Sequence, residues 1–159
     1  MKKTRIKQIL HEMRGGILRL IQDNLPSWPK FVIKDFVYPT LSNASNDQIQ
    51  EFFDEYRHVK WDLRRDITFT IDSFIPETQD LLNDRLSGDV SHLHIPHDQQ
   101  RHSYQKHQIQ QFGIPTTPII VFQHPDQKYE VLEGWHRITQ LFTLHPEGFV
   151  YPNVFVGIV

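Results

Sequence analysis

The chain has 159 residues, with 17 basic and 19 acidic side chains, a formal net charge of −2 and no cysteine. One domain with its own core fits this length, cysteine chemistry is excluded, and the slight negative charge disfavours nonspecific DNA binding as the main task. There is neither an apolar run long enough to cross a bilayer nor a secretory signal, so we expect a cytoplasmic protein without a membrane partner.

Residues 1–57 are predicted to form a helical N-terminal layer of short helices. The first helix covers residues 5–22, where apolar residues recur at helical spacing. Its other face is basic, which would suit contact with nucleic acid or a membrane surface, but a solvated surface is the preferred interpretation. The basic residues are Lys2, Lys3, Arg5, Lys7, Arg14 and Arg19.

Two further helices are predicted before residue 58. Apolar residues from Trp28 to Phe36 repeat at spacings of three and four, and Pro39 is expected to follow the end of this helix. Ser45 and Gln48 have the spacing of a capping box, in which each side chain accepts a hydrogen bond from the other residue's backbone N–H. A third helix is therefore expected to begin at this point.

The pattern changes at about residue 58, where an α+β unit is expected to begin and to continue to the C-terminus. Alternating apolar residues predict one or two strands between residues 58 and 72. Pro76 suits the first turn of a following helix, and Gly88 can end it. We therefore predict the α+β fold class, within a single domain that covers residues 1–159.

A histidine-bearing loop at residues 89–97 is followed by a polar helix. Asp98 can cap this helix, which is predicted over residues 99–112 and is expected to end at Gly113. So polar a helix is expected to face a wet cleft. Three histidines of the loop suggest a zinc site, but their spacing is poor for one, so a surface loop is the preferred interpretation. They are His92, His94 and His97.

The C-terminal segment is predicted as strand, turn, strand, helix and strand. The turn is expected at Pro125 and Asp126, and one glycine, Gly134, separates the second strand from the helix. The predicted elements are the strands Pro118–Phe122 and Tyr129–Leu132, the helix Trp135–Leu144 and the strand Val154–Val159.

The junction at Gly134 is the best indication of function in the sequence. A glycine at a strand-to-helix turn lets the backbone approach a ligand, and the first N–H groups of a helix attract anions, phosphate above all. Arg137 adds a guanidinium whose geometry matches two phosphate oxygens. The alternative is an ordinary helix start, with Arg137 in a surface ion pair with Glu133 or Glu130.

A helix ending in glycine, a Pro-Ile-x-Val strand, a second strand and a Gly-x-His-Arg turn occur in this order. They are Gln108–Gly113, Pro118–Val121, Tyr129–Leu132, and Gly134 with His136 and Arg137. This order resembles the ParB N-terminal/sulfiredoxin superfamily, over about residues 98–159. The resemblance implies a small mixed sheet with flanking helices, and a nucleotide-phosphate site at the glycine turn.

Proteins of that superfamily bind CTP or ATP at this turn, so the resemblance implies a nucleotide (ATP, ADP or CTP) together with Mg²⁺. Its members include nucleotide-gated DNA clamps, ATP-dependent reductases, a free-amino-acid kinase and ParB-like nucleases, many of them carried by phages. Trp135 stands where sulfiredoxins have their catalytic cysteine, which excludes sulfinic acid reduction. No helix-turn-helix region follows the unit before Val159, so we do not expect a chromosome-partition clamp.

Four more residues at the turn are assigned candidate roles. Glu133 can bind Mg²⁺ or accept a proton, although a carboxylate at this position also stabilises the helix dipole. His136 can donate to phosphate or act as an acid or base, or it can pack under the loop. Trp135 can stack on a nucleobase or belong to the core. Thr139 can reach the same anion or lie exposed on the helix.

Three residues of the preceding polar segment complete the candidate site. By the resemblance alone, Arg101 and His102 are expected to face Arg137 across the cleft and to help bind the nucleotide. Asp98 can be a catalytic carboxylate beside Glu133 and His136, although helix capping explains it with no further assumption.

Two classes of function remain. The first is a nucleotide-dependent phosphotransferase or hydrolase, in which Gly134, Arg137 and backbone N–H groups hold the phosphates, and a small molecule or nucleic acid is the acceptor. The second is a ParB-like nuclease, or a non-catalytic adaptor that binds nucleic acid or a protein. A homodimer is compatible with either class.

Overall fold

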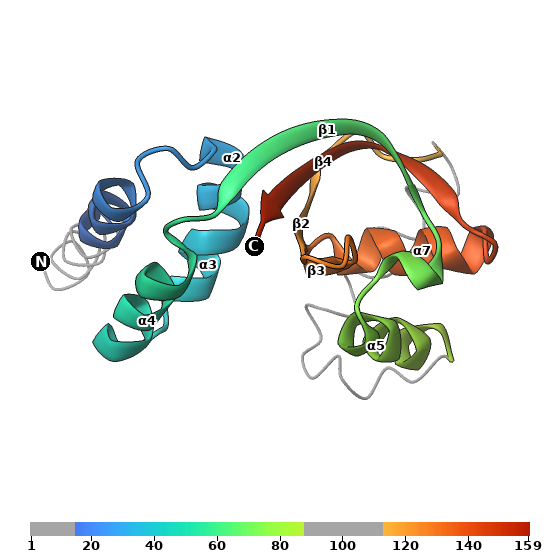
Figure 1. The fold of residues 1–159 in the computed structure, drawn as a ribbon, viewed down its shortest axis with the longest axis horizontal. Coiled ribbons are helices and arrows are strands. Elements are labelled where there is room, and N and C mark those ends of the chain that lie inside the picture. The colour runs from blue at the N-terminus through green and yellow to red at the C-terminus, as the bar shows by residue number, and fades with distance from the viewer. Residues whose placement is uncertain (1–14, 88–112) are drawn as a thin grey trace, which may run out of the picture. The chain divides into compact units, whose positions relative to one another are not determined.

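The computed structural model describes residues 15–87 and 113–159, and the chain divides into two compact units, Met1–Trp61 and Asp62–Val159. The first unit is helical, whereas the second combines helices with a four-stranded sheet (Figure 1). The α+β fold class is therefore confirmed. That the two units form a single domain stays a prediction.

The first unit contains helix at residues 15–24, and then a continuous helical stretch made of three consecutive elements. These elements are α2 (Lys30–Val32), the π-helical turn η1 (Ile33–Val37) and α3 (Tyr38–Leu41). The prediction that this helix stops before Pro39 is wrong, because Pro39 lies in the first turn of α3. A proline crowds the preceding turn of an α-helix, and the wider π-helical turn just before it relieves that crowding.

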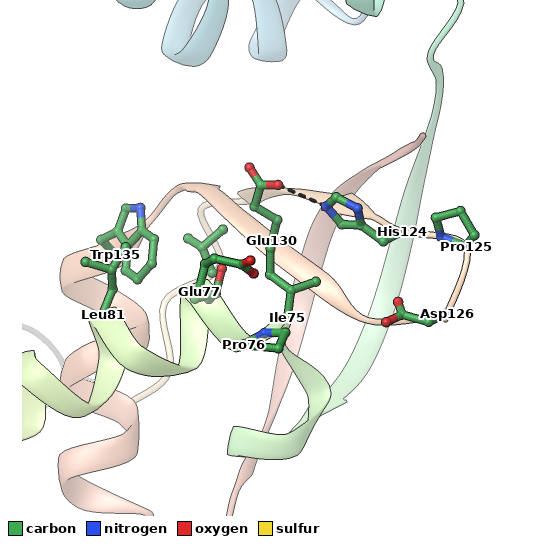
Figure 2. A pocket seen from close by; sticks show the side chains of 11 residues that line it. Ile75, Pro76, Glu77, Leu81, His124, Pro125, Asp126, Glu130 and Trp135 are labelled. Carbon is green, nitrogen blue, oxygen red and sulfur yellow. Dashed lines mark hydrogen bonds and ion pairs between the residues drawn. The ribbon is translucent and has the colours of Figure 1, made fainter.

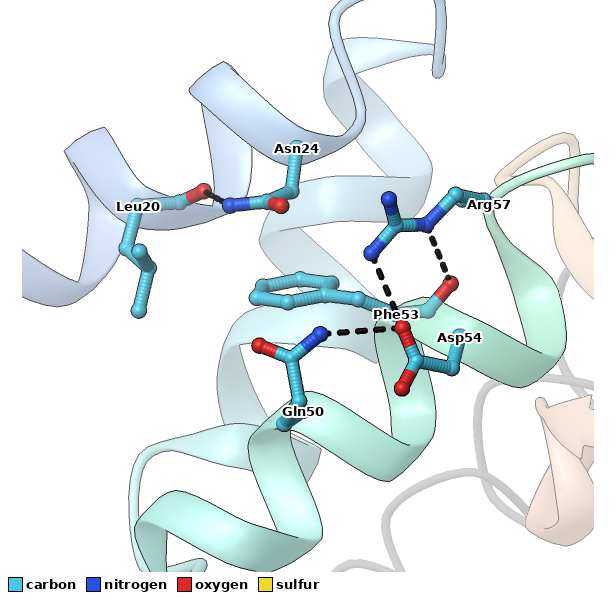
Figure 3. A network of polar contacts seen from close by, with 6 residues as sticks. All are labelled: Leu20, Asn24, Gln50, Phe53, Asp54 and Arg57. Atoms are coloured by element: carbon cyan, nitrogen blue, oxygen red, sulfur yellow. Dashed lines mark hydrogen bonds and ion pairs between the residues drawn. The ribbon is translucent and has the colours of Figure 1, made fainter.

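Helix α4 (Asn46–Tyr56) begins with the predicted capping box. The Ser45 hydroxyl accepts from the Gln48 N–H at 3.2 Å, and the Gln48 side chain accepts from the Ser45 N–H at 2.9 Å. Figure 3 shows the other end of α4, where Arg57 donates to the Phe53 carbonyl at 3.0 Å and to Asp54 at 3.1 Å. At the start of α4 the side chains thus satisfy backbone N–H groups that lack partners within the helix. At its end, the Arg57 side chain adds a second bond to a carbonyl that already accepts from the Arg57 N–H.

The buried residues of the first unit are mostly aromatic and aliphatic side chains from the helices. The Trp28 ring lies edge-on to the Trp61 ring, with 5.1 Å between the ring centroids. Such edge-to-face pairs add to the free energy of burial. The core includes Ile21, Leu25, Trp28, Val32, Val37, Leu41, Ile49 and Phe53.

The second unit is built on a sheet with the strand order β1-β4-β2-β3. Strand β2 (Ile119–Gln123) pairs in parallel with β4 (Phe149–Ile158) and antiparallel with β3 (Tyr129–Glu133), so the sheet is mixed. All five residues of β2 are buried, as expected for a strand with a neighbour on each side.

Two strands differ from their predicted form. The segment between residues 58 and 72 forms one strand, β1 (Lys60–Phe69), in which Asp66 has a φ of 56° and the alternation of buried and exposed residues is lost. Leu63, one of the alternating apolar residues of this segment, is 49% exposed. Strand β4 begins at Phe149 rather than at Val154 and includes Pro152, which lies before the residues that pair with β2. A proline is tolerated there because no ladder bond to β2 needs its missing N–H.

Helices α5 (Pro76–Leu86) and α7 (Trp135–Leu144) lie on one side of the sheet and contact each other (Figure 1). Pro76 occupies the first turn of α5, and α7 has the predicted bounds. Their apolar faces meet the inner face of the sheet, where Phe142 packs against Phe149 with ring centroids 4.8 Å apart. This core holds the β3–α7 junction in place.

Candidate functional site

The junction predicted to be functional links the end of β3 to the start of α7 through Gly134. Gly134 has φ 106° and ψ 17°, a left-handed conformation that turns the chain from strand into helix. The Gly134 carbonyl accepts from the Ile138 N–H at 3.0 Å. The N–H groups of residues 135–137 lie before this first intrahelical bond, so they have no acceptor within the helix. No N-cap side chain accepts from them either. The turn therefore has the backbone geometry that attracts an anion.

Gly134 is also required by packing. A Cβ atom at this position would lie 2.5 Å from Cγ2 of Ile119, in addition to the strain of the positive φ. The group that lies close to Gly134 on this side is the buried Ile119 side chain, so close approach of a ligand to this turn stays a prediction. Any ligand must reach the turn from another direction.

Arg137 is buried, with only 8% of its surface exposed. Its Nη1 donates to the Thr117 carbonyl at 2.9 Å and to the Tyr151 hydroxyl at 3.4 Å. The surface ion pair with Glu133 or Glu130 is therefore wrong as an explanation, because the side chain lies inside the unit and Glu130 pairs with His124. Within the described residues, no carboxylate forms an ion pair with Arg137.

The second guanidinium nitrogen of Arg137 faces the glycine turn. A Cβ on Gly134 would lie 3.5 Å from Nη2, so this nitrogen approaches the start of α7 closely. The buried Tyr151 hydroxyl holds the guanidinium on its other side and donates to the same Thr117 carbonyl at 2.7 Å. Burial raises the pKa of Tyr151, although the positive charge of Arg137 opposes this, so Tyr151 stays protonated and remains a donor.

The other residues of the turn lie in different environments. Glu133 and His136 are half-buried at the two sides of Gly134. Thr139 is 1% exposed and donates to the Trp135 carbonyl at 2.7 Å, so its hydroxyl is used within the helix. Trp135 packs against the core. The Arg85 guanidinium lies over the Trp135 ring, 5.3 Å from the ring centroid. The structure thus brings Glu133, His136 and Arg137 to one turn and turns Thr139 inward.

Several predicted site residues lie outside the described residues. They are Asp98, Arg101 and His102, the three loop histidines, and the basic residues of the first helix before residue 15. Arg19 is described and exposed. Within residues 15–87 and 113–159, no three His, Asp or Glu side chains gather as a metal ion requires, and no helix is long and apolar enough to cross a bilayer.

A pocket of about 820 Å³ lies beside the turn and was missed by the sequence reasoning (Figure 2). It is lined by the first turns of α5, the β2–β3 hairpin and Trp135. In the hairpin, His124 Nε2 lies 2.9 Å from Glu130 Oε1. The sequence contains a partial signal of this contact, because residues on the two sides of the predicted turn at Pro125 can pair across a hairpin. No local pattern links that hairpin to α5.

Comparisons with known proteins give no match of any of three kinds. No protein-family model, no curated protein and no solved structure matches this chain. The resemblance to the ParB N-terminal/sulfiredoxin superfamily therefore stays a prediction.

Proposed function

We propose that the protein binds the phosphate groups of a nucleotide at the Gly134 turn. The observation that carries this proposal is the buried Arg137 guanidinium, which has no carboxylate partner among the described residues and presents Nη2 to an uncapped helix start. A buried charge without a counter-ion costs free energy, and an anion at the turn offsets that cost. Phosphate suits both the helix dipole and the guanidinium.

The proposed ligand is ATP, ADP or CTP, and the proposed activity is phosphotransfer or phosphate hydrolysis. In such reactions the protein contributes mainly positioning and charge stabilisation. Glu133 and His136 flank the turn and are the candidates for moving a proton. Mg²⁺ would be held by Glu133 together with the nucleotide phosphates, because carboxylate and phosphate oxygens are the ligands that Mg²⁺ prefers. The ordered motifs of the sequence support the same proposal.

The main test is a thermal-shift panel of ATP, ADP and CTP with Mg²⁺. We expect at least one nucleotide to stabilise the wild type by about 2.7 kcal/mol at roughly 100 times its Kd. Arg137→Ala is expected to lose this shift, and Arg137→Lys to keep a reduced one, because lysine retains the charge but not the two-pronged geometry. Each shift is measured against the melting temperature of the same variant without ligand.

The matched control is Arg65→Ala, which removes an exposed arginine of the same unit. Its ligand-induced shift is expected to equal that of the wild type. Equal shifts in wild type and Arg137→Ala would refute the phosphate site. Isothermal titration of the same variants checks that the shifts report binding.

Turnover separates the enzyme from the alternative functions. If the stabilising nucleotide is also consumed, and Glu133→Gln or His136→Gln slows this consumption, the phosphotransferase or hydrolase proposal holds. Stabilisation without turnover favours a ligand-gated adaptor. No nucleotide effect, with salt-sensitive retention or cleavage of DNA, favours the ParB-like nuclease.

A further inference from the structure

The pocket beside Trp135 has the size of a small-molecule site and is open to solvent on one side. Its volume of about 820 Å³ falls within the range typical of ligand pockets, roughly 300–1,000 Å³. Figure 2 shows α5 on one side and the β2–β3 hairpin on the other, with Trp135 and Leu81 together at one end. All of these elements belong to the second unit, so the pocket is part of one compact body.

The charged groups of the pocket are mostly acidic. Glu77, Asp126 and Glu130 contribute carboxylates, and His124 contributes the only basic group among the lining residues that the structure describes. His124 is already bonded to one oxygen of Glu130. Among the described residues Glu77 has no ion-pair partner. The charge of the described lining therefore favours a positively charged ligand.

Among the described residues, neither of two nearby basic side chains forms an ion pair with these carboxylates. The Lys128 ammonium donates to the Asp72 carbonyl, and the Lys128 N–H bonds to Asp126 at 3.0 Å as part of the hairpin turn. The Arg85 guanidinium lies over the Trp135 ring. That contact shows that the ring already attracts a cation on one side.

The walls of the pocket are apolar. Ile75 and Pro76 lie at the start of α5, Val131 lies on β3, and Leu81 and Trp135 close one end. A ligand that fits must therefore combine a positive charge near Glu77 and Glu130 with an apolar body directed toward Leu81 and Trp135.

We propose that this pocket binds a small organic cation, namely an amine with an apolar or aromatic body. The ammonium group lies between the carboxylates of Glu77 and Glu130 and donates to the Glu130 oxygen that His124 leaves free. The apolar body packs against Leu81 and Trp135. The preferred charge is opposite to that of a phosphate, so this site does not rest on the nucleotide proposal.

The test uses phenethylamine as the probe, with phenethyl alcohol and phenylacetate as neutral and anionic analogues of similar shape. Two-dimensional amide NMR spectra report binding residue by residue. We expect phenethylamine to shift the amides of Glu77, Glu130 and Trp135 in a saturable way, with an affinity about threefold or more above that of the alcohol and with phenylacetate weakest.

Charge-removing variants test whether the carboxylates of Glu77 and Glu130 bind the ammonium group. Glu77→Gln and Glu130→Gln are each expected to weaken phenethylamine binding about threefold, and the double variant about tenfold. Glu147→Gln, an exposed glutamate of the same unit that does not line the pocket, is expected to bind as the wild type does. Equal affinities for the amine, the alcohol and the acid would overturn the proposal. So would an unchanged affinity in the double variant, or no saturable shift with the amine.

Discussion

Arg137 shows how one side chain can have a structural and a binding role at once. Its Nη1 ties the start of α7 to the Thr117 carbonyl, twenty residues earlier in the chain, and to the Tyr151 hydroxyl on β4. Its Nη2 is left facing the glycine turn. The first set of bonds fixes the guanidinium, and fixed donors cost less free energy to organise when an anion binds.

Tyr151→Phe tests this arrangement through pH. Burial raises the pKa of Tyr151 above its usual 10.0, so below pH 10 the residue is protonated in both the folded and the unfolded state. As the pH rises above 10, the unfolded chain loses this proton first, and the free energy of unfolding falls until the folded-state pKa is passed. We expect the wild type to lose more stability than Tyr151→Phe in this range.

Chemical denaturation between pH 8 and 11.5, roughly spanning this window, gives the measurement. Tyr129→Phe is the control, because it removes the hydroxyl of another, half-buried tyrosine of the same unit. Parallel curves for wild type and Tyr151→Phe would contradict the prediction. At neutral pH, Tyr151→Phe is expected to cost about 1 kcal/mol, since a buried hydroxyl bond to Thr117 is lost.

Two helices of this chain begin in opposite ways. Helix α4 closes its first turn with Ser45 and Gln48, so its N–H groups have partners within the protein. Helix α7 follows a glycine that has no side chain to accept from its first turn. A closed helix start contributes to stability, whereas an open one can accept an anion.

Ser45→Ala is expected to lower the free energy of unfolding of the first unit by about 1 kcal/mol, because the Gln48 N–H loses its acceptor. Denaturant titration measures the loss. Ser27→Ala, an exposed serine of the same unit, is the control and is expected to change stability by less than about 0.5 kcal/mol. A similar loss in both variants would mean that the capping box contributes nothing specific.

For the chain as a whole, the division into two compact units predicts that they lose structure separately. Gly134→Ala is the sharpest probe. It places a Cβ 2.5 Å from Ile119 and forces alanine into a positive φ, which is expected to cost about 3 kcal/mol in the second unit.

Amide hydrogen exchange measures this effect in each unit. Gly134→Ala should speed exchange of the slow amides of β2, β4 and α7, and leave those of α4 nearly unchanged. Ser45→Ala serves as the reciprocal control, with the opposite distribution. A uniform rise in exchange across both units in either variant would show that they unfold as one cooperative body.

Features that depend on neighbours in sequence were predictable. The periodicity of residues 135–144, the capping box at Ser45 and the proline at the start of α5 are local patterns, and the structure confirms each of them. Features in which tertiary contacts override the local pattern could not be predicted from the sequence. The helix continues through Pro39. Strand β1 loses its alternation at Asp62 and Leu63, which are both exposed, and again before Asp66, which has a positive φ.

The sequence alone was sufficient for the α+β class and for the glycine turn between β3 and α7, because both follow from local propensity and spacing. Only the folded chain decided that Ile119 fills one side of Gly134, that Arg137 turns inward to Thr117 and Tyr151, and that an acidic pocket forms beside Trp135. The physical reason is distance along the chain. These contacts join residues far apart in sequence, and close packing rather than local pattern selects them.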